Sequence, residues 1–219
     1  MTLKLIAVAA LVLTLPLSAQ QPVADRLRGA APEVVQAVET ALAQATERGL
    51  PGEPLVQKAI EGTAKSAPPE RIVAAINALL ERLGVASRAL RESGVESPDG
   101  ASVEAGAFAL SAGLGEGDVV SLARAGARSH AVEVTLRVAG TLAAIGVPAA
   151  QVLQLVNQAL EEGPASGRLA ALPGQVQAAV ARGAPPAAAA QGLARAAENR
   201  ANRPDPPRRP PRPEHPTHP

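Results

Sequence analysis

Proline and glycine divide this chain into short aliphatic segments. Four of these segments open on Pro and close on Gly, at residues 32–49, 54–62, 69–84 and 148–163. Proline is tolerated in the first turn of a helix, where its missing N–H would have no partner, and glycine adopts the left-handed conformation that ends a helix. The punctuation therefore predicts an all-α fold, an array or bundle of short helices in antiparallel hairpins.

The first 19 residues have the pattern of a secretory signal peptide. Lys4 precedes an apolar run at residues 5–15, and the small residue Ala19 follows. The run is shorter than the roughly 20 apolar residues that span a bilayer, and a charged start with a small-residue end is typical of a cleaved signal. We expect cleavage after Ala19, an exported protein in the periplasm or outside the cell, and no membrane span afterwards. An uncleaved anchor is the alternative.

The composition restricts both the core and the chemistry. Cysteine is absent, which excludes disulfide bonds and thiolate nucleophiles. Phe108 is the single aromatic residue, so the core must consist of Ala, Val, Leu and Ile. Alanine buries little area, and apolar burial stabilises a fold by about 25 cal/mol per Å². We therefore expect modest stability.

Apolar residues at steps of three and four place the individual helices. The third helix either continues through Gly84 or bends there, because an interior glycine costs up to about 1 kcal/mol relative to alanine. Ser102 and Asp118 are of the residue types that cap a helix start. The sequence predicts helices at 32–49, 54–62, 69–90, 102–112, 118–126, 129–145, 148–163 and 186–199, with two short helices interrupted at Pro173 and Gly174.

Residues 132–138 are ambiguous between helix and strand. Val132, Val134, Leu136 and Val138 alternate with polar residues, as in a half-buried strand. A single strand in an otherwise helical chain would have no partner, so we predict a helix.

Two fragments of the sequence recur. GLP at residues 49–51 resembles GVP at 146–148, and KSAPP at 65–69 resembles RGAPP at 182–186. The two offsets, 97 and 117 residues, differ. The pattern is therefore either a degenerate helical repeat or independent helix punctuation in an alanine-rich chain.

The stretch GLPGEPLVQKAIEGTAKSAPPERI, residues 49–72, resembles a segment found in exported bacterial helical proteins of unassigned function. The resemblance covers a small part of the chain. It implies neither an activity nor a ligand.

The composition changes abruptly near residue 200. Residues 200–219 hold eight Pro and five Arg and almost no apolar side chain, which predicts a disordered tail after a helical domain at 20–199. Arg208, Arg209 and Arg212 are the candidate partner contacts, because arginine binds carboxylates and phosphates in two-pronged geometry. An envelope protein or an anionic polymer would suit them. A solvated appendage, or a tail of charge +3 folded onto a body of charge −3, are the alternatives.

No catalytic, cofactor-binding or metal-binding set is apparent in the sequence. In a helix His130 would lie one turn from Glu133, and His215 and His218 fall in the tail, but a metal site needs three or four convergent ligands. The adjacent Glu161 and Glu162 are typical of a solvated helix end. The glycine-rich residues 113–118 lack the Lys and Ser or Thr of a phosphate-binding loop and predict a helix connection.

These observations favour a non-enzymatic binding or scaffold protein of the bacterial cell envelope, with no cofactor. An enzyme using carboxylates from distant helices is one alternative, and a structural protein attached through its basic tail is another. Nucleic acid is not an expected partner, because the body is mildly acidic. The sequence leaves the partner and the oligomeric state open.

Overall fold

The computed structural model describes residues 23–129, 131–162 and 167–201. Every regular element within these ranges is a helix, which confirms the all-α prediction. The helices are α1 (Val23–Arg26), α2 (Pro32–Glu47), α3 (Glu53–Ala64), α4 (Pro69–Glu92), α5 (Gly100–Ser111), α6 (Glu116–Arg128), α7 (Val132–Ile145), α8 (Ala149–Glu161), α9 (Arg168–Ala181) and α10 (Pro186–Ala201).

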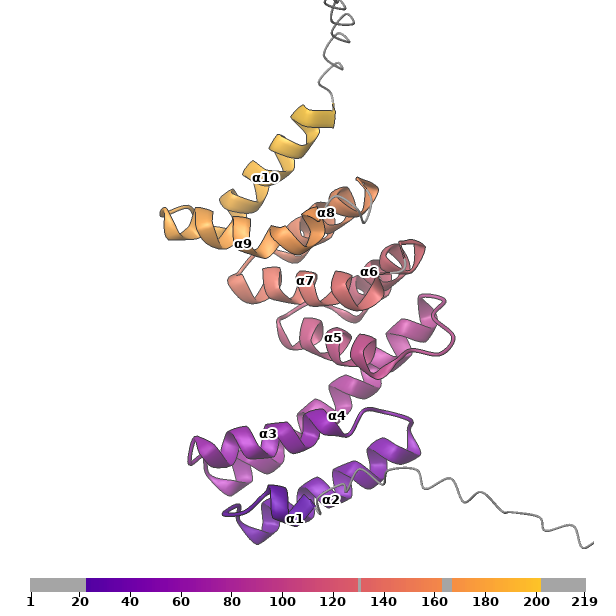
Figure 1. Ribbon diagram of the computed structural model, residues 1–219, viewed down its shortest axis with the longest axis vertical. Coiled ribbons are helices and arrows are strands. Elements are labelled where there is room, and N and C mark those ends of the chain that lie inside the picture. Colours follow the sequence, from indigo (N-terminus) through magenta and orange to yellow (C-terminus); the bar gives the residue numbers. More distant parts are fainter. Residues whose placement is uncertain (1–22, 130, 163–166, 202–219) are drawn as a thin grey trace, which may run out of the picture.

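The helices form an elongated stack that follows the order of the sequence. In Figure 1, α1 and α2 lie at one end of the long axis and α10 lies at the other. Each helix packs mainly on the next helix or on the one after it, as in the pairs α4 with α5, α5 with α7 and α8 with α10. Contacts of this kind, local in sequence, are typical of helical solenoids.

Helix α4 joins two parts of the stack, one formed by α1 to α3 and the other by α5 to α10. It packs on α2 and α3 on one side and on α5 and α6 on the other. Its side chain Ile72 lies against Gly62 of α3, and Ala86 lies against Gly106 of α5. The sequence left open whether this helix bends at Gly84 or continues through it. The structure shows one continuous helix.

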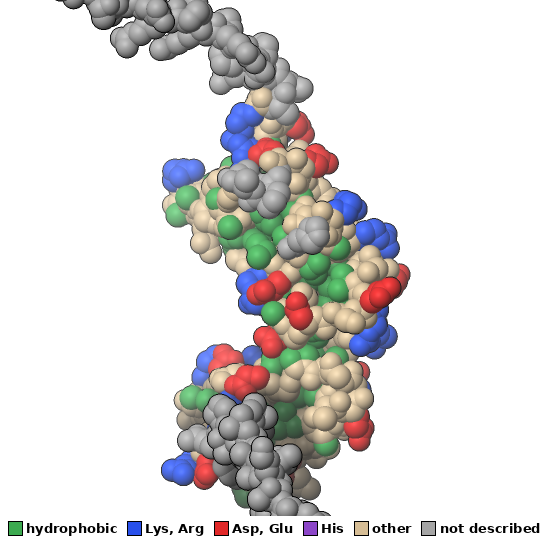
Figure 2. All heavy atoms as spheres, turned by 45° about the vertical axis from the view of Figure 1, so that its right-hand side comes forward, with side chains coloured by type: hydrophobic (Ala, Val, Ile, Leu, Met, Phe, Trp, Pro, Cys, Tyr) green, Lys and Arg blue, Asp and Glu red, His purple; other side chains and the backbone are tan. Residues whose placement is uncertain are grey.

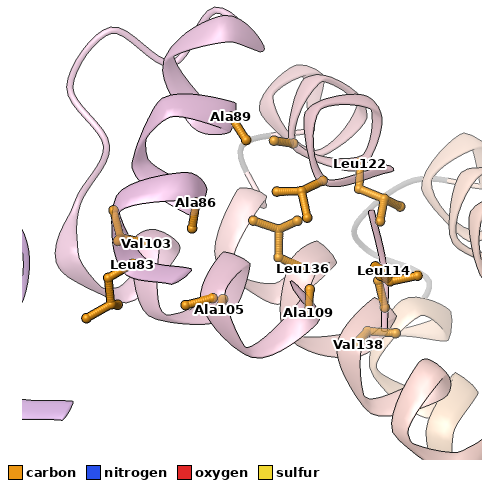
Figure 3. Packing of buried hydrophobic residues seen from close by; sticks show 14 of the residues in the cluster. Leu83, Ala86, Ala89, Val103, Ala105, Ala109, Leu114, Leu122, Leu136 and Val138 are labelled. Carbon is orange, nitrogen blue, oxygen red and sulfur yellow. The ribbon is translucent and has the colours of Figure 1, made fainter. Parts of the chain in front are cut away.

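Small residues allow the helices of the core to approach closely. A Cβ atom added at Gly106 would lie 3.0 Å from Ala86 Cβ, and one added at Gly126 would lie 2.9 Å from Thr135 Oγ1. Figure 3 shows the aliphatic side chains that fill the space between α4, α5, α6 and α7. The core is therefore aliphatic, as the composition required.

Proline and glycine punctuate the helices in part as predicted. Prolines occupy the first turns of α2, α3 and α4, and Gly49 and Gly146 have positive φ angles where α2 and α7 end. Gly62, predicted as a helix end, lies inside α3 instead, and Gly84 lies inside the continuous α4. At Gly62 the reason is packing, because an added Cβ would lie 2.8 Å from Ile72 Cγ1.

The predicted caps were wrong at two helix starts. Asp99 rather than Ser102 caps α5, and its carboxylate accepts a hydrogen bond of 2.6 Å from the Ser102 N–H. Helix α6 begins two residues before Asp118, whose carboxylate accepts a hydrogen bond of 2.9 Å from the Gly115 N–H. In both cases the acidic side chain satisfies a free N–H group at the helix start, three residues away from it.

The predicted interruption at Pro173 and Gly174 was also wrong. Helix α9 passes through both residues as one helix, and Leu172 and Val176 on either side of them are buried. Helix α7 begins at Val132 rather than at 129, and the residues 132–138 are helical. Helix α10 extends to Ala201, two residues beyond the predicted end of the helical domain.

None of the helices in the described ranges is both long enough and apolar enough to cross a membrane.

Candidate functional site

A groove of about 660 Å³ lies between the two parts of the stack. Helices α3 and α4 form one wall, and α5 and α7 form the other. Figure 2 shows the surface hollowed at this waist, with charged side chains on the borders. The groove is lined by Pro54, Lys58, Ala75, Ala78, Leu79, Arg82, Leu83, Glu104, Ala107, Phe108, Ser111 and Arg137.

The groove is apolar along α4 and α5. Ala75 and Ala78 are exposed on α4, and Phe108 of α5 is 40% exposed. The ring of Phe108 lies on α7, because a Cβ atom added at Gly140 would come within 2.7 Å of Phe108 Cδ1. One side of the Phe108 ring thus packs on Gly140, and another side is exposed to solvent. The result is an apolar surface flanked by small side chains.

Cations border this apolar surface. Lys58, Arg82 and Arg137 line the groove together with one carboxylate, that of Glu104. Lys58 forms an ion pair of 2.8 Å with Glu61, and Arg137 forms one of 2.9 Å with Glu133. Arg82 makes no ion pair with any residue that the structure describes. Arg82 is therefore available to an anionic group brought by a ligand.

A second hollow of about 330 Å³ shares Lys58 and Ala75 with the groove and extends it along α3 and α4. Lys65 and Arg71 line it, and the Lys65 ammonium lies 2.5 Å from the Glu61 carboxylate. Hydrogen bonds from Lys58 and then from Lys65 lower the pKa of Glu61 from 4.5 to about 2. Glu61 therefore stays ionised at neutral pH and holds the two lysines side by side.

Charge is distributed unevenly over the molecule. The two hollows are lined by five cations and two carboxylates, an excess of three positive charges. Residues 20–199 as a whole carry 15 basic and 18 acidic side chains, a net charge of −3. The groove is thus a basic region on an acidic body. Two of the three lysines in the sequence, Lys58 and Lys65, line the second hollow.

The segment 49–72, singled out by its resemblance, builds much of this region. It contributes Pro54 and Lys58 to the groove, and Lys58, Lys65 and Arg71 to the second hollow. Its amino-terminal part is fixed by an ion pair, because Arg26 of α1 donates hydrogen bonds of 2.8 and 2.5 Å to the Glu53 carboxylate. The segment therefore has a definite place in the fold.

The site residues taken from the sequence lie outside the part of the chain that the structure describes. Arg208, Arg209 and Arg212 fall outside the described residues, as do His130, His215 and His218.

The acidic pairs and the glycine-rich connection considered from the sequence are placed as follows. Glu133 pairs with Arg137, and Glu162 at the end of α8 pairs with Arg168. The glycine-rich residues 113–118 connect α5 to α6 and form the start of α6, which agrees with the predicted connection.

Carboxylates do not gather within the described part of the chain. No group of three or more His, Asp or Glu side chains there could hold a metal ion. The buried polar side chains of this part are Ser87, Ser93, Ser102 and Thr135.

Sequence reasoning missed the groove because its walls come from four separate helices whose packing no single segment reveals. One signal was present: Ala75, Ala78 and Arg82 recur at helical spacing on α4, beside the face whose Ile72 and Ile76 are buried. The other was Phe108, the single aromatic residue of the chain.

Comparisons of the chain with protein-family models, with curated proteins and with solved structures found no match.

Proposed function

We propose that this chain is an exported, non-enzymatic binding protein of the bacterial cell envelope whose groove between α3, α4, α5 and α7 holds a segment of a protein partner. The observation that carries the proposal is the groove itself, with an exposed aromatic ring and exposed alanines between charged borders. When a partner covers apolar surface that was in contact with water, the free energy falls by about 25 cal/mol per Å² of that surface.

The architecture supports a role in binding. Stacked helices in which each contacts its neighbours present extended concave surfaces, and such surfaces are used to hold peptides and proteins. Antiparallel hairpins repeated along the stack would produce this geometry. We include that arrangement in the proposal, together with export guided by residues 1–19.

The two alternative functions have less support on the described surface. An enzyme using carboxylates from distant helices needs these groups to converge in a pocket, and the groove contains the single carboxylate of Glu104. Attachment through the tail depends on Arg208, Arg209 and Arg212, which lie outside the described residues.

Affinity capture from an envelope extract tests the proposal. Ala78 and Asn77 are neighbouring exposed residues of α4, but Ala78 lines the groove and Asn77 is absent from its lining. The full chain, the Ala78→Glu variant and the Asn77→Glu variant would each be used as bait. Both variants add the same charge at an exposed helical position, so they match in their effect on the fold.

A partner of the groove will be recovered by the unmodified chain and by the Asn77→Glu variant, and lost with the Ala78→Glu variant. Recovery of the same proteins in the same amounts by all three baits contradicts the proposal. Circular dichroism of the three proteins, with equal helical signals, confirms that the comparison concerns the surface and not folding.

A further inference from the structure

We infer that the groove is selective for an acidic segment of a protein partner, one that places carboxylates beside Arg82 and an apolar side chain on Phe108. This inference rests on the proposed function and adds the chemistry of the partner. It is carried by the charge of the groove together with its apolar lining.

Arg82 is the central residue of the proposed contact. It projects from α4 into a groove that also contains the apolar Leu79 and Ala78. Lys58 and Arg137 already have the acidic neighbours Glu61 and Glu133, whereas Arg82 makes no ion pair within the described ranges. Arginine binds a carboxylate through two parallel hydrogen bonds, so a partner carboxylate would satisfy this side chain directly.

The second hollow extends the same preference. Arg71 lines it without an ion pair to any described residue, next to Lys58 and Lys65. The cationic side chains thus form a row along α3 and α4. A segment with several acidic residues would match this row better than a single anion.

The chain's own tail has the wrong charge for this site. Residues 200–219 hold five arginines and two acidic residues, so their charge has the same sign as the groove. Like charges placed opposite each other disfavour association. The occupant is therefore a segment of another molecule with the opposite charge.

The lining favours a peptide over other polyanions. Single-stranded nucleic acid is held by stacking of its bases on aromatic side chains, and Phe108 is the single aromatic residue of the sequence. The exposed Ala75 and Ala78 instead offer small apolar contacts that suit aliphatic side chains. Apolar anchoring combined with charge pairing at the border is the usual anatomy of a protein interface.

Three fluorescein-labelled probe peptides test the inference. They share one amphipathic pattern of leucines, and their remaining positions are Glu, Gln or Lys. Anisotropy titrations against the full chain at low salt will show the Glu peptide binding about tenfold or more tightly than the Gln peptide, with the Lys peptide weakest. Added salt will weaken the Glu peptide most, because surface charges are screened.

Two substitutions locate the binding. Arg82→Glu will weaken the Glu peptide about tenfold or more, while the same change at Arg88, an exposed residue of α4 that lines neither hollow, will leave its affinity within about twofold. Arg82→Lys, which keeps the charge but loses the two-pronged geometry, will retain part of the affinity.

The outcomes separate this inference from the proposed function. Equal binding of the Glu and Lys peptides, no binding of the Glu peptide, or a Glu peptide that is insensitive to Arg82→Glu overturns the inference. An unlabelled oligonucleotide or a phosphatidylglycerol vesicle that displaces the Glu peptide more effectively than unlabelled Glu peptide also overturns it. In each case the capture experiment with Ala78→Glu still decides, by itself, whether the groove binds a protein partner.

Discussion

The ring of Phe108 on α5 lies directly against the backbone of Gly140 on α7. A Cβ atom added at Gly140 would come within 2.7 Å of Phe108 Cδ1 and within 3.1 Å of the Ala109 Cα atom. The first contact involves a side chain, but the second involves backbone that cannot rotate away. Gly140 therefore sets the distance between α5 and α7, and with it the position of the ring in the groove.

Substitution of Gly140 by alanine should destabilise the fold. Overpacking costs typically 1–3 kcal/mol, and alanine recovers up to about 1 kcal/mol through its higher helix propensity. The expected net loss in the free energy of unfolding is about 1 kcal/mol, measured by urea denaturation. Unchanged or increased stability of Gly140→Ala would show that α5 and α7 are not held in this close contact.

The same substitution at Gly84 should have the opposite effect. A Cβ atom at this position of α4 would meet nothing closer than Arg88 Nη1 at 3.8 Å. Alanine should therefore raise the free energy of unfolding by up to about 1 kcal/mol, in proportion to its helix propensity. Urea denaturation of Gly84→Ala measures the gain, and a loss of stability would mean that α4 bends at this residue.

Replacement of Thr135 by valine should stabilise the protein. Thr135 is fully buried on α7, and its Oγ1 atom has no hydrogen-bond partner among the residues that the structure describes. Valine has nearly the same shape and removes the buried hydroxyl, so a gain of about 1 kcal/mol is expected. Thr141 is the control, because its hydroxyl donates a hydrogen bond of 2.8 Å to the Arg137 carbonyl. Thermal melts in which Thr141→Val gains as much as Thr135→Val would refute this explanation.

Stability should fall with acid in part through Glu53. Hydrogen bonds from Arg26 and then from Gln57 lower the pKa of this carboxyl from 4.5 to about 2. Because the pKa is depressed in the folded state, the contribution is present above pH 4.5 and is lost as the pH falls from 4.5 towards 2. Its size is less than about 1 kcal/mol, since the pair is exposed to solvent.

Urea denaturation of the unmodified chain and of Glu53→Gln between pH 2 and pH 6 measures this contribution. The stability difference between the two proteins should shrink towards zero at the acid end. A difference that stays constant across this range would exclude Glu53 as a source of the acid sensitivity.

Most helices could be predicted from the sequence because apolar spacing and proline positions act locally. The start of α2 at Pro32 and the left-handed Gly49 after it follow from such local rules. Pro173 does not follow them. Its ring removes one helical hydrogen bond at a cost of about 3 kcal/mol, yet the burial of Leu172 and Val176 keeps α9 in one piece. Tertiary packing of this kind cannot be read from local preferences.

The groove was even less accessible to prediction. Its walls join Lys58 on α3, Arg82 on α4 and Arg137 on α7, which are up to 79 positions apart in the sequence. The sequence drew attention instead to Arg208, Arg209 and Arg212, because arginines among prolines form a compact local pattern. Local patterns favour candidates within one segment, whereas this site depends on how several helices stack.

The most direct test of the central claim compares the two large apolar side chains that are exposed in the described part of the chain. Phe108 is 40% exposed and lines the groove, whereas Val134 is 44% exposed and is absent from its lining. The measurement is the affinity of the full chain, of Phe108→Ser and of Val134→Ser for a partner recovered by affinity capture. We predict that Phe108→Ser weakens binding at least about tenfold and that Val134→Ser changes it less than about twofold. Equal effects of the two substitutions would contradict the assignment of the groove as the binding site.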